Sequence, residues 1–195
     1  MNPHAHIDLA VPVNPTDHVL GPEHTAAVVV EYGDFECPLC KQAAPAVKML
    51  LQRFPERVRF VFRHFPLESL HPHALLAAQA AESAAGQDRF WQMHDLLFAH
   101  QDHLKLRDLR SYAQQLGLDM TRFDAEMGDS IYLQRVREQI EGGRRSHLKS
   151  TPGFFVNGMI VDVSFGLHAL VDATAAALES LHHRAGSSRS GASRE

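Results

Sequence analysis

Residues 27–40 read AVVVEYGDFECPLC and carry the clearest structural signal in the chain. The first six residues, from Ala27 to Tyr32, form a short β-branched run, which is typical of a strand buried on both faces. Pro38 stands where a helix would begin, because its missing N–H leaves no hydrogen bond unmade in the first turn. Apolar residues then recur at the helical period over residues 46–54, and residues 58–63 predict a second strand. This succession predicts a right-handed βαβ unit with parallel strands.

Cys37 and Cys40, the two cysteines of the chain, fall at the start of this helix. Their spacing brings the two sulfurs close enough to bond. We expect Cys37 to be exposed at the helix tip, where unpaired N–H groups and the helix dipole stabilise a thiolate. A lowered thiol pKa increases the fraction of the reactive anion. We therefore expect Cys37 to exchange with external disulfides and Cys40 to resolve the mixed disulfide.

A cysteine pair with this spacing is also half of a tetrahedral zinc site. The chain has 14 histidines, and His71-Pro72-His73 is the candidate second pair of ligands. Zinc pairs of this kind lie on loops rather than at the mouth of a buried βαβ unit, and residues 71–73 resemble the entry to a helix. We therefore expect no metal, with zinc as the alternative.

The remainder of the patterned region predicts helices followed by a hairpin. Residues 71–149 show the helical period, and one helix over residues 131–140 is expected to fade at Gly142-Gly143. Asn157-Gly158 between two apolar runs, residues 153–156 and 159–163, is a strong hairpin signal. A last helix is expected over residues 168–181. Residues at helical spacing are assigned to the core (Phe90, Trp91, Phe98), and two histidines to the surface (His100, His103).

The sequence resembles the DsbA-like thiol–disulfide oxidoreductases over roughly residues 18–180. Residues 29–40 are similar to the active-site stretch of that family, and residues 150–158, STPGFFVNG, to its cis-proline segment and hairpin. Residues 62–95 are also similar, especially to the branch fused to some sodium/proton antiporters. The resemblance implies an α/β protein with a thioredoxin fold (βαβ … ββα) and an inserted all-helical domain.

These features together predict a division of the chain into four parts. The thioredoxin-fold domain would comprise residues 26–66 and 150–181, and the helical insertion residues 67–149. Residues 1–25 would form an N-terminal arm with at most one short strand near residues 7–11. Residues 185–195 lack any large apolar residue, so we expect a disordered tail over residues 182–195.

The resemblance also implies roles for single residues. Cys37 matches the family's nucleophile, Cys40 its resolving cysteine, and Pro152 the cis-proline that faces them; the alternative is an ordinary trans proline. The backbone of Thr151 would then pair with an extended substrate segment as an added strand. We expect the substrate to contact four residues (Thr151, Pro152, Pro38 and Leu39).

Three acidic residues lie close to the cysteines. Glu31 matches a buried acid of the family; a desolvated carboxyl there should titrate high and could carry the proton of Cys40. The alternative is a carboxylate that is solvated or paired with Arg59 or Arg63. Asp34 and Glu36 are expected in a solvated loop. Leu39 occupies the position at which strongly oxidising members have histidine, so the redox poise is left open.

Composition excludes several classes of protein. A net charge of −4 gives no basic excess, so neither nucleic acid nor an anionic membrane is expected as the partner. The apolar runs, such as residues 26–30 and 74–78, are far shorter than the roughly 18 residues that a membrane span needs. No secretory signal is predicted. We expect a cytoplasmic protein or, alternatively, a processed extracytoplasmic form.

We therefore expect a monomeric protein-disulfide oxidoreductase that acts through Cys37-Pro38-Leu39-Cys40 without a cofactor. Its partners would be protein thiols and disulfides, together with an unidentified redox partner. Two alternatives stay open. One is a reductase or isomerase, and the other is a non-catalytic thioredoxin-fold module that binds extended peptide or zinc.

Overall fold

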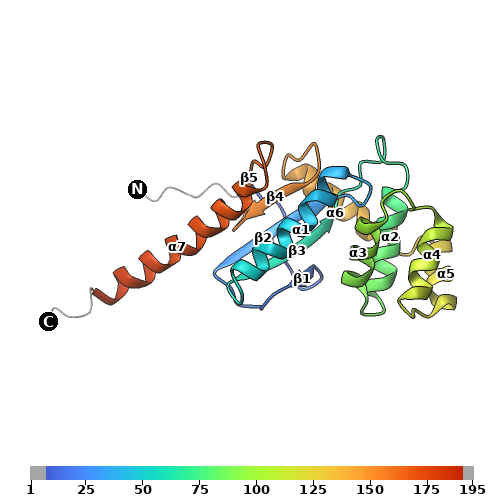
Figure 1. Ribbon diagram of the computed structural model, residues 1–195, viewed down its shortest axis with the longest axis horizontal. Helices are drawn as coiled ribbons and strands as arrows, with labels where there is room; N and C mark the ends of the chain where they lie inside the picture. Colours follow the sequence, from blue (N-terminus) through green and yellow to red (C-terminus); the bar gives the residue numbers. More distant parts are fainter. Residues whose placement is uncertain (1–7, 191–195) are drawn as a thin grey trace.

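Five strands form one mixed sheet at the centre of the computed structural model, which describes residues 8–190 (Figure 1). The strand order is β1-β3-β2-β4-β5. β2 and β3 run parallel, as the predicted βαβ unit requires, and the other three pairs are antiparallel. The strands are β1 (His18–Leu20), β2 (Ala27–Gly33), β3 (Val58–His64), β4 (Gly153–Val156) and β5 (Met159–Val161).

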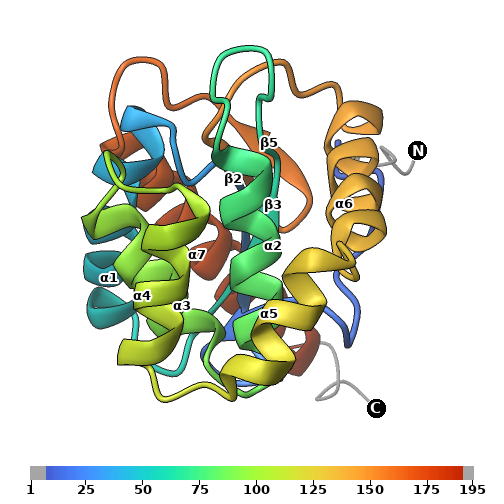
Figure 2. The ribbon, with the colours of Figure 1, turned by 90° about the vertical axis from the view of Figure 1, so that its right-hand side faces the viewer.

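Helices cover both faces of this sheet and extend beyond one end. α1 and α7 pack on one face and α6 on the other, while α2 to α5 gather beside the sheet (Figures 1 and 2). The helices are α1 (Pro38–Arg53), α2 (Ala74–Ala85), α3 (Phe90–Ala99), α4 (Leu106–Gln115), α5 (Met120–Gly128), α6 (Leu133–Arg145) and α7 (His168–Ser190). The α/β class and the helical block are as predicted.

The central strand β2 is the apolar run at the start of residues 27–40. Its side chains alternate between the two faces. Val29 joins the core under α1, whereas Val30 and Tyr32 join the core under α6. Glu31 therefore lies on the α1 side, at a position that an apolar residue would ordinarily occupy.

Gly142 and Gly143 do not end α6, contrary to the prediction. The helix continues to Arg145 because the two glycines let it approach the sheet closely. A Cβ atom on Gly143 would lie 2.5 Å from Cδ2 of Phe65, and one on Gly142 would lie 3.1 Å from Oη of Tyr32. The two glycines therefore allow close packing of α6 and do not end the helix.

The predicted hairpin at Asn157-Gly158 is confirmed. Both residues have positive φ angles, 49° and 82°, as a two-residue type I′ turn requires. β5 is shorter than expected and ends at Val161. The turn also receives the N-terminal arm, because the backbone N–H groups of Asp8 and Leu9 donate to the Gly158 carbonyl over 2.9 and 3.0 Å.

Three further elements differ from the prediction. The expected strand near residues 7–11 is not formed by residues 8–11, and residue 7 lies outside the described residues; the first strand is β1 instead. α5 was not singled out, although Asp119 caps it by accepting a hydrogen bond from the Arg122 N–H. α7 continues to Ser190, into the segment predicted as a disordered tail, because extending a formed helix costs far less than starting one. Residues 191–195 lie outside the described residues.

Candidate active site

The turn between β2 and α1 places the two cysteines at a helix start. Cys37 is the N-cap residue of α1, with an extended backbone (φ −77°, ψ 122°), and Pro38 opens the first turn. Cys40 is fully buried, whereas 5% of the Cys37 surface is accessible. The prediction that Cys37 is exposed at the helix tip is therefore wrong, because only a small part of its surface is accessible. Instead, Leu39 projects from the turn and is 58% exposed.

The segment that partly covers Cys37 is the one predicted from the resemblance. The Thr151–Pro152 peptide bond is cis. Sγ of Cys37 lies 3.4 Å from the carbonyl oxygen of Thr151, to which it donates a hydrogen bond when it is a thiol. Residues 37 and 151, which are far apart in the sequence, thus meet at one point of the surface.

The two thiols have opposite acidities. The pKa of Cys37 is lowered to about 5, chiefly by a hydrogen bond from the Cys40 thiol and against the opposing effect of burial. A side-chain hydrogen bond with Thr151 and the backbone N–H groups of Cys40 and Leu39 contribute to this lowering. Burial raises the pKa of Cys40 well above its usual range, and the hydrogen bond to Cys37 and the charge of Glu31 raise it further. Cys37 is therefore the thiolate at neutral pH, and Cys40 is the thiol.

Glu31 lies beneath the cysteines and is 2% exposed. Its Oε1 atom has no hydrogen-bond partner within residues 8–190. Burial, and secondarily the charge of Cys37, raise the pKa of Glu31 from 4.5 to about 8. The alternative of a solvated or arginine-paired carboxylate is wrong, because Arg63 binds Asp17 instead and Arg59 donates to the Glu23 carbonyl. Glu31 is thus mostly protonated at pH 7, with a minor ionised fraction.

The prediction of a solvated loop for Asp34 and Glu36 is also wrong. Asp34 is 1% exposed. Its carboxylate accepts hydrogen bonds from the backbone N–H groups of Glu36 and Leu67, both over 2.8 Å, and from Nδ1 of His71 over 2.7 Å. These bonds replace the lost hydration and fix the loop that precedes Cys37.

Glu36 pairs with the second histidine of the segment considered for zinc. Its carboxylate accepts from the backbone N–H of His73 over 2.7 Å and contacts Nδ1 of that residue over 2.9 Å. α2 begins directly afterwards, at Ala74, so residues 71–73 are a helix entry as predicted. Both imidazoles bind carboxylates of the active-site loop through Nδ1. Within residues 8–190, neither imidazole gathers with the two cysteines into a group that could hold a metal ion.

One further residue that positions the loop was not found from the sequence. Nε2 of Gln101, just after α3, donates to the backbone carbonyls of Phe35 and Cys37 over 2.8 and 2.9 Å. A glutamine in a polar stretch carries no signal of such a role. The helical block therefore contacts the active-site turn directly.

Comparisons with known proteins decide the family. The family model described as thioredoxin matches residues 13–173. The chain belongs to the thioredoxin family. Among solved structures, oxidised BdbD from Bacillus subtilis is similar to this thioredoxin-family chain with a TM-score of 0.74 and 22% identity, over 83% of this chain and 92% of that one. A thioredoxin-like oxidoreductase from Silicibacter pomeroyi DSS-3 is similar with a TM-score of 0.70 and 25% identity, over 82% and 93%.

Curated relatives of the thioredoxin-family chain carry antiporter names. The Na(+)/H(+) antiporter NhaA 1 of Salinispora arenicola is 49% identical over 172 residues, which are 88% of this chain and 26% of that protein. The NhaA 3 protein of Salinispora tropica is 47% identical over 179 residues, 91% of this chain and 27% of that protein. The chain spans about a quarter of the length of these relatives. The predicted resemblance to DsbA-like proteins and to an antiporter-fused branch is confirmed.

Beside the cysteines, this member of the thioredoxin family has a groove of about 450 Å³. Its walls are Leu39, the Thr151–Pro152 segment and residues 163–167. Phe165 in the last of these segments is 90% exposed. No motif assigns residues 163–167 to the site, because their position depends on how the chain returns from β5 to α7.

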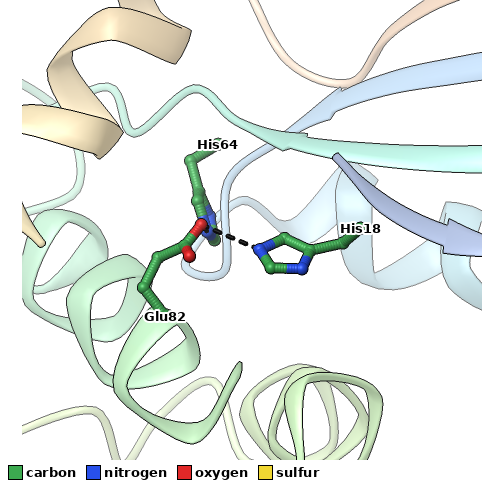
Figure 3. A group of neighbouring side chains, drawn as sticks. All are labelled: His18, His64 and Glu82. Atoms are coloured by element: carbon green, nitrogen blue, oxygen red, sulfur yellow. Dashed lines mark hydrogen bonds and ion pairs between the residues drawn. The ribbon is translucent and has the colours of Figure 1, made fainter. Parts of the chain in front are cut away.

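A buried cluster joins the thioredoxin-family sheet to α2 (Figure 3). Oε1 of Glu82 contacts Nε2 of His18 over 2.9 Å and Nε2 of His64 over 3.0 Å, and the three atoms lie within 4.8 Å of one another, as metal ligands could. Burial opposes the charge of Glu82, but the hydrogen bonds from the two histidines outweigh it and hold its pKa well below the usual range. Arg135 already neutralises the carboxylate, since its Nε donates to Oε2 over 2.7 Å. We therefore interpret the cluster as an ion-paired junction between β1, β3 and α2.

Proposed function

We propose that this protein exchanges disulfides with protein substrates through Cys37-Pro38-Leu39-Cys40. The observation that carries the proposal is the contrast between the two thiols. Cys37, with a pKa of about 5, is partly accessible, while Cys40 has a raised pKa and is fully buried. Nucleophilic attack on a disulfide requires a thiolate, and resolution requires a second thiol that only the first sulfur can reach.

The reaction takes two exchange steps. The Cys37 thiolate attacks one sulfur of a substrate disulfide, and the other substrate sulfur leaves as a thiolate. In molecules in which Glu31 is ionised, a minority at pH 7 because its pKa is about 8, Cys40 then transfers its proton to the Glu31 carboxylate and attacks Sγ of Cys37. This attack releases the second substrate thiolate and forms the Cys37–Cys40 disulfide. The reverse sequence oxidises a substrate dithiol, with Glu31 returning the proton to Cys40.

We propose extended protein segments as the substrates. Thr151 lies beside Cys37, and its backbone N–H has no hydrogen-bond acceptor among residues 8–190. That N–H is free to bind one peptide group of a substrate, as an added strand would. Pro38 and Leu39 are exposed on the other side of the sulfur, and the groove beside Leu39 would take an apolar side chain.

In this proposal the protein acts as a monomer without a cofactor. An unidentified redox partner would restore its oxidised or reduced form. Whether the cell uses the chain as an oxidase, a reductase or an isomerase depends on its reduction potential. Leu39 bears on that question, because it offers no hydrogen-bond donor to the Cys37 thiolate. Among residues 8–190 no helix combines the length and apolar character that a membrane crossing requires.

Trapping of mixed disulfides tests the proposal. Cys40→Ser should accumulate protein adducts on Cys37 that dissolve with dithiothreitol, because the resolving thiol is missing. Cys37→Ser is the matched control and should accumulate none. Adducts on neither variant, together with unchanged free thiols when the wild type meets a disulfide peptide, would favour the non-catalytic module.

A further inference from the structure

A cavity of about 180 Å³ lies on the α1 side of the sheet, between α1 and α3. One turn of each helix forms its walls, with Ala44 and Lys48 on α1 and His94 and Asp95 on α3. Its floor includes Glu31 of β2. The cavity therefore extends from the acid beneath the cysteines to a different surface from the one that carries Cys37.

The inner end of the cavity is a carboxyl group without a partner. Glu31 is 2% exposed, and its Oε1 atom accepts no hydrogen bond from residues 8–190. A buried carboxyl group in this situation ordinarily binds an ordered water. The remaining walls near it are mainly apolar, so the cavity itself offers the room for such a water.

The outer end is a charged group that is open to solvent. Nζ of Lys48 lies 2.7 Å from Oδ2 of Asp95, and the two side chains are 57% and 49% exposed. Nδ1 of His94 lies 3.1 Å from Oδ1 of the same aspartate, and the His94 side chain is 7% exposed. The three side chains thus bridge bulk water and the interior.

Proton transfer during disulfide exchange requires such a connection. Each time Cys40 attacks Cys37, one proton leaves a fully buried sulfur, and Glu31 can hold only that one. The next cycle requires Glu31 to be a carboxylate again. On the active-site side, Cys37, Thr151 and the substrate itself cover the path to solvent.

We propose that the cavity between α1 and α3 is the route by which protons pass between Glu31 and solvent, with Lys48, His94 and Asp95 at its mouth. This inference rests on the proposed function. Its volume exceeds what one water needs, and it offers polar partners at both ends. The proton lost by Cys40 passes to Glu31, then to water in the cavity, and then to bulk solvent, while the sulfur electrons stay within the disulfide exchange. Burial lowers the pKa of His94, so its ring is neutral at pH 7 and adds no positive charge to the route.

Filling the cavity without altering Glu31 tests the route. Ala44→Leu places a larger side chain in the wall, and Ala46→Leu is the matched control, since Ala46 is partly buried on the same helix but does not line the cavity. The probe is dithiobis-nitrobenzoate with the reduced protein. The first thionitrobenzoate released reports attack by Cys37, and the second reports attack by Cys40 on the mixed disulfide.

We expect Ala44→Leu to slow the second release by on the order of tenfold, a part of the roughly 10²–10⁴-fold that proton transfer contributes to such steps. The first release should be unchanged, and Ala46→Leu should alter neither. The wild type should show a solvent isotope effect on the second release alone. If Ala44→Leu does not fold, Leu51→Phe fills the same cavity from the next turn and has the same expected result.

Failure of the route and failure of the function give different results. A wild type that never releases the second thionitrobenzoate contradicts the proposed function. A wild type that releases it, a Glu31→Gln variant that is slow and a folded cavity-filled variant that is as fast as wild type contradict the route alone.

Discussion

The burial of Glu31 predicts a pH-dependent loss of stability that Glu31→Gln should remove. The pKa of Glu31 is about 8 in the folded protein, and its ordinary value is 4.5. The unfolded chain therefore releases the Glu31 proton at lower pH than the folded protein does. The contribution of Glu31 to the free energy of unfolding is fully present below pH 4.5 and is lost as the pH rises towards and through 8. Each pH unit in that window costs about 1.4 kcal/mol.

At pH 7 the wild type should therefore have lost about 3 kcal/mol of unfolding free energy through this group, and about 5 kcal/mol above pH 8. Glu31→Gln abolishes the titration. The amide adds a buried N–H₂ group, which costs about 1–3 kcal/mol without a partner. The net gain at pH 7 should thus be about 0–2 kcal/mol, smaller than the change in pH dependence.

The assay is urea unfolding of the reduced wild type and Glu31→Gln at intervals from pH 5 to pH 8. Subtracting the two curves cancels the titrating groups that do not interact with Glu31. The difference should grow by about 1.4 kcal/mol per pH unit. Two parallel curves would show that Glu31 ionises normally in the folded protein and would refute the argument from desolvation.

Three other measurements test the roles of single residues. Iodoacetamide at pH 6 should label Cys37, which is mostly thiolate there, and spare Cys40; equal labelling would contradict the assignment of roles. Leu39→His should raise the reduction potential measured against glutathione by about 30 mV, or about tenfold in the equilibrium constant, because histidine can donate to the thiolate; an unchanged or lower potential counts against this. Gly143→Ala should destabilise the protein by about 1–3 kcal/mol in urea, because its Cβ atom would lie 2.5 Å from a ring carbon. Gly128→Ala is the control, with nothing within 4 Å, and should be neutral or slightly stabilising; equal effects would reject the packing explanation.

Local chemistry made the first part of the site predictable. Pro38 after a β-branched strand indicated the helix start, and Asn157-Gly158 indicated the hairpin. These signals lie within a few residues of the structure that they specify. The position of Glu31 was predictable as well, because a strand alternates its faces and an acid in an apolar run must be buried or lie at an end.

The environment of Asp34 and the course of α6 could not be predicted, because they depend on contacts between segments that are distant in the sequence. Asp34 was assigned to a solvated loop because nothing near it in the sequence supplies its donors, which come from Leu67 and His71. Gly142 and Gly143 suggested a helix end, because the contacts that explain them, with Tyr32 and Phe65, depend on how α6 packs. In each case the deciding partner lies on another element.

The bonds from the helical block to the active-site turn have a consequence for engineering. His71, His73 and Gln101 all belong to the segment that interrupts the thioredoxin fold, and all bind residues 34–37. A shortened chain that joins residue 66 directly to residue 150 would keep every strand of the sheet. It would nevertheless lose the supports that orient the reactive sulfur. The helical insertion is therefore required to position the active-site turn. Transferring the Cys37-Pro38-Leu39-Cys40 motif alone into another protein would omit the hydrogen bonds that orient Cys37.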